Sequence, residues 1–235
     1  MVVYPDMHQA IRLHLDKSTS LTGSVDFLPE ELDFWLNEAQ DRFIKQRLFG
    51  NNYRQEKFDS TQKRIDDLRS LIVTKTNIAL SQSILGSNIK DCNLPITDIS
   101  LPYLFYIDSG LQDISNNILQ TGDTLHFELL GRYIKDSVND PYIRRPLVIF
   151  YNNGTNDKIG FVYGDEFIPV TCDITYIRKP RQLIYTTPGT YQTNTCELPE
   201  QTHREIVIIA VELLIENIES QRVQTFSQLN ASKSE

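Results

Sequence analysis

The residues that could carry acid–base or metal chemistry are scattered along this sequence. Its four histidines are His8, His14, His126 and His203, and none forms an i,i+4 pair, an HxH pattern or an HExxH pattern. Such spacings matter because they place two ring nitrogens where one metal ion can reach both. We therefore expect no histidine-based metal site. His203 is expected to cap a helix or lie on the surface, and His126 to lie half-exposed on a strand.

The cysteines and paired carboxylates also lack a catalytic pattern. Cys92, Cys172 and Cys196 are widely spaced and include no CxxC pair, so reduced structural thiols are the expected state. The pairs Glu30–Glu31 and Asp66–Asp67 have charged neighbours, which is typical of a solvated helix face. The sequence has no GxxxxGK[ST], no GxGxxG after a strand and no GxSxG. These observations predict a protein that is not an enzyme and holds no cofactor or metal.

Two basic clusters could contact nucleic acid or a neighbouring subunit. The first comprises Arg132, Lys135, Arg144 and Arg145, and the second comprises Arg178, Lys179 and Arg181. Both adjoin tyrosines, and basic and aromatic groups together can hold a single strand. Because the net charge is −8, phosphate binding is not expected to be the main task. Salt bridges to carboxylates of another subunit remain the alternative.

Three helices are expected in the N-terminal region, over residues 5–17, 28–52 and 58–73. The second has the clearest signals, because Pro29 suits the first helical position and Gly50 suits the residue just beyond the end. Acidic residues in its first turn complement the positive end of the helix dipole. Its apolar stripe consists of Leu32, Trp35, Leu36, Ala39, Phe43 and Leu48.

From about residue 77 to residue 195 the sequence becomes rich in Tyr, Ile, Val, Thr and Phe. Strands are predicted at 101–110, 124–134, 146–154, 158–170 and 172–180, and "YNNGTNDK" predicts a hairpin. Their spacing favours antiparallel structure, as a small sandwich or an open barrel. The expected fold class is α+β, a helical body of N-terminal and C-terminal helices with an inserted antiparallel β-rich module. The expected segments are residues 1–80, 81–195, 196–222 and an extended arm over 223–235.

The helix expected over residues 196–222 is apolar around most of its circumference. At about 100° per residue, its four glutamates at 205, 212, 216 and 219 form one narrow stripe. A helix of this kind is buried nearly all round. It is either a central core helix or a helix with one face packed inside the subunit and another against a neighbouring subunit. In the second case the expected interface residues are Ile208, Ile209, Leu213 and Ile215.

Three stretches together resemble the head–tail connector proteins of tailed bacteriophages. They are "LPEELDFWLNEAQDRFIKQRLFG", "DITYIRKPRQL" and "ELPEQTHREIVIIAVELLIENIESQR". The chain is most similar to the portal adaptor, or ring, proteins of short-tailed crAss-like phages that infect Bacteroidetes. The resemblance covers most of the chain and rests on the order of these segments and on their residue composition.

The resemblance implies a structural virion protein at the neck of the particle. It implies a ring of about twelve copies that docks on the portal protein, extends the DNA channel and offers a docking surface to other tail or ring proteins. Double-stranded DNA would pass without sequence recognition, the C-terminal arm would reach the portal or a neighbour, and no catalytic residues would be carried over. The N-terminus lacks a signal-peptide pattern and no apolar run could span a membrane, so we expect synthesis in the host cytoplasm and no membrane partner.

Three alternatives remain open on the sequence. The chain could be another tail structural protein, such as a tail-tube or tail-completion protein. It could be a nucleic-acid-binding regulator that uses the basic clusters. It could also be a small hydrolase or nuclease with an unrecognised site, although the missing metal-ligand spacing argues against this.

Overall fold

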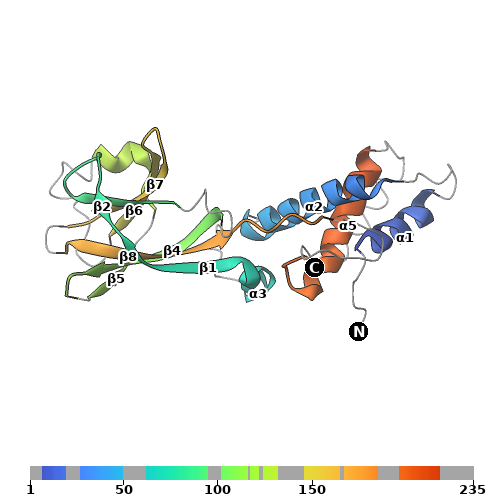
Figure 1. The fold of residues 1–235 in the computed structure, drawn as a ribbon, viewed down its shortest axis with the longest axis horizontal. Helices are drawn as coiled ribbons and strands as arrows, with labels where there is room; N and C mark the ends of the chain where they lie inside the picture. Colours follow the sequence, from blue (N-terminus) through green and yellow to red (C-terminus); the bar gives the residue numbers. More distant parts are fainter. Residues whose placement is uncertain are drawn as a thin grey trace. The chain divides into compact units, whose positions relative to one another are not determined.

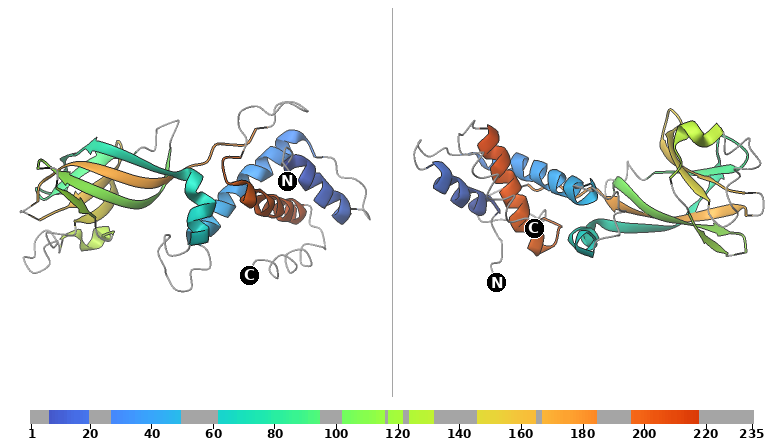
Figure 2. Two further views of the ribbon diagram at one scale, coloured as in Figure 1. Left: turned by 90° about the horizontal axis from the view of Figure 1, so that it is seen from below. Right: turned by 180° about the vertical axis from the view of Figure 1, so that it is seen from behind.

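The chain folds into two compact units. The computed structural model describes residues 7–19, 27–49, 62–94, 102–115, 117–121, 124–131, 146–164, 167–184 and 196–217. The helical unit consists of Met1–Leu71 and Pro180–Glu235, and the β unit consists of Ile72–Lys179 (Figures 1 and 2). The protein therefore belongs to the α+β class, as the sequence predicted.

The helical unit is built on three main helices, α1 (Met7–Thr19), α2 (Pro29–Phe49) and α5 (Glu200–Asn217). Helix α5 packs against both α1 and α2 (Figure 1). The buried apolar residues of these three helices, within the described part of the chain, are Ile11 and Leu15 of α1, Leu32, Leu36, Ala39, Phe43, Ile44 and Leu48 of α2, and Ile206, Val207, Ala210, Val211, Leu214 and Ile215 of α5. Burial of these stripes, rather than helix propensity alone, stabilises the unit.

Helix α2 forms as its sequence predicts. It begins at Pro29, and Glu31 Oε2 accepts a hydrogen bond from the backbone N–H of Leu28 at 3.1 Å. This contact is the carboxylate half of a capping box. Asn37 then ties the returning chain to α2, because its side-chain amide exchanges two hydrogen bonds with the backbone of Leu183, at 2.9 and 2.7 Å.

A partly buried ion cluster joins three helices of the helical unit. Arg47 near the end of α2 donates to Asp67 at 2.9 Å and to Glu205 of α5. Asp67 belongs to α3 (Gln62–Leu68) and also accepts from Gln201 at 3.1 Å. Truncating Arg47 would leave the buried Asp67 carboxylate without its cation, which is costly.

Helix boundaries differ from expectation in two places. Helix α3 is followed by a 3₁₀ turn, Arg69–Leu71, and residues 72–79 then form strand β1 (Ile72–Ala79). These residues were expected in the helical segment that spans residues 1–80, but Ile72, Val73 and Thr74 are β-branched and suit a strand. Helix α5 starts at Glu200, where the Thr202 hydroxyl donates to the Pro199 carbonyl at 2.7 Å. Residues 218–235, including the expected arm, lie outside the described residues.

The described residues of the β unit form two four-stranded sheets with antiparallel pairing throughout their named strands. One sheet has the order β1, β8 (Pro169–Arg178), β4 (Tyr103–Asp113) and β5 (Ile118–Gln120). The other has the order β2 (Ser81–Gln82), β3 (Ile89–Asn93), β7 (Asp157–Val162) and β6 (Leu147–Asn152). Their inner faces share one core, to which Cys92 and Phe161 come from one sheet and Leu111 and Ile174 from the other. Of the two expected forms, the unit therefore has the sandwich form.

Two strand predictions need correction. Residues 124–134 were expected as a strand, but Thr124 makes only a single bridge to Val148 and Phe127–Leu129 is a 3₁₀ turn. Leu130 instead packs over the outer face of the β3–β7–β6 sheet with Ile89 and Ile149. The single strand expected at 158–170 is two strands, because β7 ends at Val162 and β8 begins at Pro169 in the other sheet.

The predicted hairpin is confirmed between β6 and β7. Asn152 pairs with Asp157, and Gly154 has a φ of 88°, which suits glycine. The Asn153 side chain accepts hydrogen bonds from the backbone N–H groups of Thr155 and Asn156, at 3.0 and 2.8 Å. These local contacts explain why the short sequence was sufficient to predict the turn.

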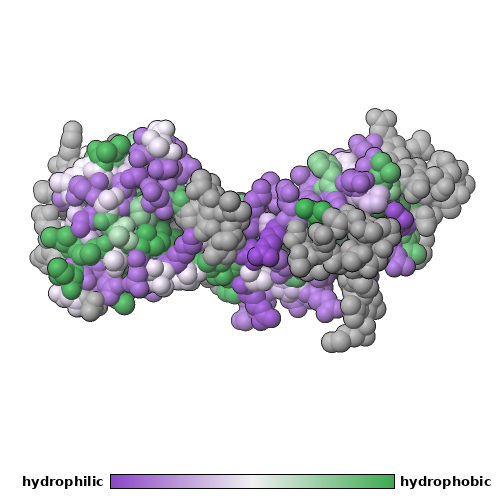
Figure 3. Space-filling view, viewed as in Figure 1, coloured by the Kyte–Doolittle hydropathy of each residue, from purple (hydrophilic) through white to green (hydrophobic). Residues whose placement is uncertain are grey.

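Apolar surface on the β unit lies in patches among polar residues, as Figure 3 shows for one face. Among its described residues, the exposed large apolar ones are Ile84, Leu104, Ile114, Ile118, Phe127, Ile168 and Val170. None of the described helices of the chain combines the length and apolar content that a membrane crossing requires.

Candidate functional site

The half-buried face of α5 is the first candidate site, because three of the four predicted interface residues lie on it. Ile208, Ile209 and Leu213 keep part of their surface exposed within the single chain. Ile215 differs from the expectation, since it is only 3% exposed and belongs to the core of the helical unit. At about 100° per residue it lies near the buried arc of α5, on the side away from Leu213.

An acidic stripe runs between these apolar residues. Glu205, Glu212 and Glu216 fall within a narrow arc of α5, with Ile208 on one side and with Ile209 and Leu213 on the other. Glu205 is already paired with Arg47 inside the helical unit. The α5 face therefore combines apolar area with negative charge, as the sequence predicted.

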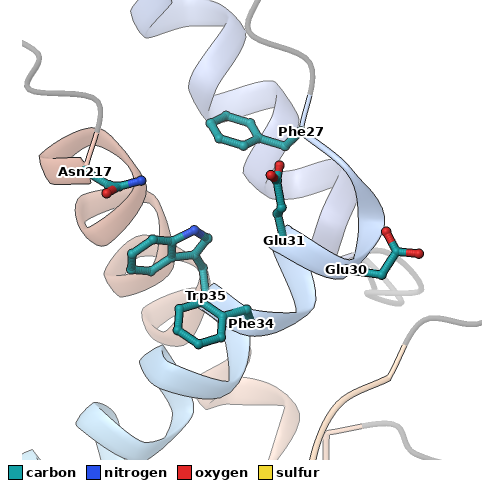
Figure 4. A pocket seen from close by; sticks show the side chains of 6 residues that line it. All are labelled: Phe27, Glu30, Glu31, Phe34, Trp35 and Asn217. Carbon is teal, nitrogen blue, oxygen red and sulfur yellow. The ribbon is translucent and has the colours of Figure 1, made fainter.

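The row Ile209, Leu213 and Asn217 has a spacing of four residues and so follows one side of α5. It ends at a pocket of about 390 Å³ in the helical unit. We call this the acidic–aromatic pocket, and it is lined by Phe27, Glu30, Glu31, Phe34, Trp35 and Asn217 (Figure 4). Asn217 thus belongs both to the row that carries two of the predicted interface residues and to the lining of the pocket.

One aromatic side chain of this pocket, Phe34, is exposed, while Phe27 and Trp35 are half-buried. Phe34 is 61% exposed and contacts Trp35 edge to face, with ring centroids 5.2 Å apart and planes at 82°. Leu28, just before α2, is 63% exposed. Glu30 and Glu31 are exposed beside these rings, and Arg12 of α1 reaches the Phe27 carbonyl at 3.5 Å. The pocket therefore offers an apolar surface with mainly acidic charge at its rim.

Sequence reasoning missed Phe34, although a signal for it was present. Phe34 falls off the apolar stripe that contains Leu32 and Leu36, on the polar face of α2. An aromatic residue on the polar face of an amphipathic helix stays in water unless something else covers it. That misfit is the pattern that could have pointed to the pocket.

The basic residues do not form one described site. Arg144 and Arg145, like Arg132 and Lys135, lie outside the described residues. Arg178 and Lys179 end the β unit, whereas Arg181 belongs to the helical unit and pairs with Glu197 at 3.3 Å. Arg181 therefore makes one ion pair within the chain, and for all of these residues contact with DNA or with another subunit stays a prediction.

A second cluster of titratable groups lies on the outer face of the β3–β7–β6 sheet. The nearly inaccessible carboxylate of Asp91 accepts hydrogen bonds from Lys158 at 2.7 Å, from Ser81 at 2.9 Å and from Tyr151. Gly160 makes the approach of Tyr151 feasible, because a Cβ there would lie 3.3 Å from the Tyr151 ring and 2.9 Å from Ile149. No sequence pattern indicated this cluster, since its members meet only through strand pairing.

The protonation states of this cluster favour a structural role. Burial raises the pKa of Asp91, but hydrogen bonds from Lys158, Tyr151 and Ser81 outweigh it, so the pKa lies below its ordinary value. Burial and the bond to Asp91 raise the pKa of Tyr151 to about 12. Near neutral pH one group is therefore ionised and the other neutral, and neither is poised to exchange a proton.

Two thiols meet in the core of the sandwich. Cys92 and Cys172 are buried and their Sγ atoms are 3.6 Å apart. The bond to Cys92 and burial raise the pKa of Cys172 above its ordinary value, so the nucleophilic thiolate is disfavoured. Across the described ranges, no group of three or more His, Cys, Asp or Glu side chains could hold a metal ion.

Comparison with protein-family models finds no matching family, and comparison with curated proteins finds no significant match.

Proposed function

We propose that this protein is a structural virion protein, a head–tail connector subunit that oligomerises into a ring docked on the portal protein. The observation that carries the proposal is the accessible apolar surface of the helical unit, where the Ile209–Leu213 row leads to Phe34 in the acidic–aromatic pocket. Monomeric proteins avoid leaving large contiguous apolar surfaces in water. Cover by neighbouring copies removes this cost.

The proposed architecture is a helical body that makes the ring contacts, with the β unit inserted into it as a module. The helical unit is formed by both ends of the chain, and its helices share one core. This arrangement supports a rigid body that can present a fixed surface to each neighbour. The exposed apolar patches of the β unit suit a docking surface for other tail or ring proteins.

The acidic balance of the chain supports passage of DNA rather than its capture. A net charge of −8 on each copy repels phosphates, so a ring of such copies would let double-stranded DNA move through without sequence recognition. The proposed partners are identical copies, the portal protein and tail proteins, in the neck of the virion. As part of the same proposal, the protein has no enzymatic activity.

Co-expression with the portal protein of the same genome tests the proposal. We expect the two proteins to co-purify and the chain to be present in many copies on each portal assembly. Co-purification with a tail component but not with the portal would favour a tail-completion protein instead. Salt-sensitive DNA binding by the isolated chain would favour a nucleic-acid-binding protein.

A double substitution separates the two interpretations of α5. Because Ile209 and Leu213 are half-buried, we expect Ile209→Glu combined with Leu213→Glu to leave a folded monomer that no longer assembles. Val207→Glu, at a buried position of the same helix, serves as the comparison that should unfold the helical unit. If the double variant unfolds as Val207→Glu does, α5 is a core helix and the interface assignment fails.

A further inference from the structure

The exposed face of α2 carries opposite charges at its two ends. Glu31, Phe34, Glu38, Arg42 and Lys45 are all exposed and fall within about 80° of the helix circumference. The first three stand at or near the acidic–aromatic pocket, and the last two stand on later turns. Phe34 and Arg42 are about 12 Å apart along the helix axis, at about 1.5 Å per residue.

The helix dipole alone does not account for this pattern. An acidic first turn and basic last turns stabilise any helix, and Glu38 and Arg42 have the spacing of a surface pair. The dipole does not explain why an accessible phenylalanine and a pocket accompany the acidic end. Within the described residues of the chain, neither Arg42 nor Lys45 makes an ion pair that would occupy its charge.

We propose that the acidic–aromatic pocket of one copy receives the basic end of α2 from the neighbouring copy. The Arg42 guanidinium of the neighbour would stack on the Phe34 ring, where the negative face of the ring attracts a cation. Glu30 and Glu31 beside the ring would take up the positive charge of Arg42 and Lys45. The inference rests on the proposed ring function and names the surfaces through which its subunits meet.

A second copy fits this pocket because each chain carries both complementary halves on one helix face. The pocket and the basic end can meet once in each pair of subunits, which makes a heterologous contact that closes into a ring when the rotation per subunit allows. If they meet twice in an antiparallel α2 pair, the contact is two-fold and closes as a dimer; the proposed ring requires the first arrangement, and the mass of the assembly distinguishes the two. Two copies that each carry a net charge of −8 repel one another at long range. Local pairing of basic and acidic ends therefore supplies both attraction and register.

Charge reversal tests the contact, with one variant that reverses two carboxylates at or near the pocket and one that reverses the basic end. The pocket variant carries Glu30→Lys with Glu38→Lys, and the basic-end variant carries Arg42→Glu with Lys45→Glu. Glu31 is left unchanged because it also caps α2. We expect each variant alone to assemble at least about tenfold more weakly than the wild type, since like charges then meet.

Mixing the two variants should restore assembly, because each then presents the end that fits the other. A chain with all four substitutions should assemble better than either single-side variant but more weakly than the wild type, because the charges match again while the stacking of Arg42 on Phe34 is lost. The control is Lys63→Glu with Arg69→Glu, which changes the net charge as much as the basic-end variant does but at exposed positions in or directly after α3. Far-ultraviolet circular dichroism should show unchanged helix content in every variant.

The readout is the mass distribution of the full chain, with and without the portal protein, together with portal binding. The contact is overturned if both single-side variants assemble like the wild type, or if mixing them does not restore assembly. The proposed function still stands in that case if the portal is bound. Loss of portal binding only in the pocket variant assigns the pocket to the portal and overturns the second-copy occupant. A wild type that self-assembles with charge-swap rescue but never binds the portal supports the contact and overturns the proposed function.

Discussion

Replacing Phe34 with alanine separates its role in the single chain from its role in assembly. A phenylalanine side chain offers roughly 200 Å², and Phe34 is 61% exposed. About 80 Å² is therefore already buried in the single chain, which at about 25 cal/mol per Å² amounts to at most about 2 kcal/mol of folding stability. The remaining roughly 120 Å², if covered by a neighbour, contributes about 3 kcal/mol to each contact. That corresponds to roughly a hundredfold weaker association.

Phe127→Ala is the matched control for this prediction. Phe127 is 56% exposed and lies in the β unit, so its substitution removes the same atoms from a similarly accessible place. Thermal unfolding should show similar small losses for both variants, whereas mass photometry across a concentration series should show weakened assembly only for Phe34→Ala. Equal assembly of the two variants would refute the claim that Phe34 is covered by another subunit.

Three further predictions concern stability. Lys158→Met leaves the buried Asp91 carboxylate without its cation and should lower the free energy of unfolding by about 3 kcal/mol. Lys90→Met loses only a hydrogen bond to a neutral carbonyl and should lower it by about 1 kcal/mol. Urea unfolding of both variants measures the difference. Gln40 is buried and its amide lacks hydrogen-bond partners among the described residues, so Gln40→Met should stabilise by about 1–2 kcal/mol; a lower melting temperature would indicate a partner for the amide. The pKa of Tyr151 is raised to about 12 in the folded protein and is about 10 in the unfolded chain. Its contribution to folding stability is therefore complete below about pH 10 and is lost as the pH rises towards 12. Tyr151→Phe should weaken this pH dependence of stability in unfolding measured from pH 9 to pH 12.

Local sequence signals predicted the helices well where residues close to a helix end determine that end. Pro29, the acidic first turn and the apolar stripe of α2 act within a few residues of each other, and the observed helix begins at the predicted residue. The end of the third helix was misjudged, because residues 72–79 pair with β8 about a hundred positions later in the chain. Such a partner overrides local propensity and cannot be read from spacing.

The candidate site was predictable in kind but not in detail. Because α5 is apolar around most of its circumference, the sequence predicted that it is buried and suggested that a partner covers part of it. Only the packing of α5 against α1 and α2 shows that Ile215 belongs to the core and that Leu213 is half-buried. The Asp91–Lys158 pair comes from strand register across 67 positions of sequence. The Cys92–Cys172 contact comes from packing of the two sheets against each other across 80 positions. No sequence motif could have indicated these contacts, because they depend on how the strands pair and the sheets pack in the whole sandwich.

The most direct test of the central claim is the mass of the assembly that the purified chain forms with its portal protein, measured by native mass spectrometry. The account predicts one portal assembly that carries about twelve copies of the chain in a closed ring, and it predicts that Phe34→Ala reduces this occupancy while the single chain stays folded. A chain that remains a folded single copy in the presence of the portal, at concentrations well above those in an infected cell, would contradict it.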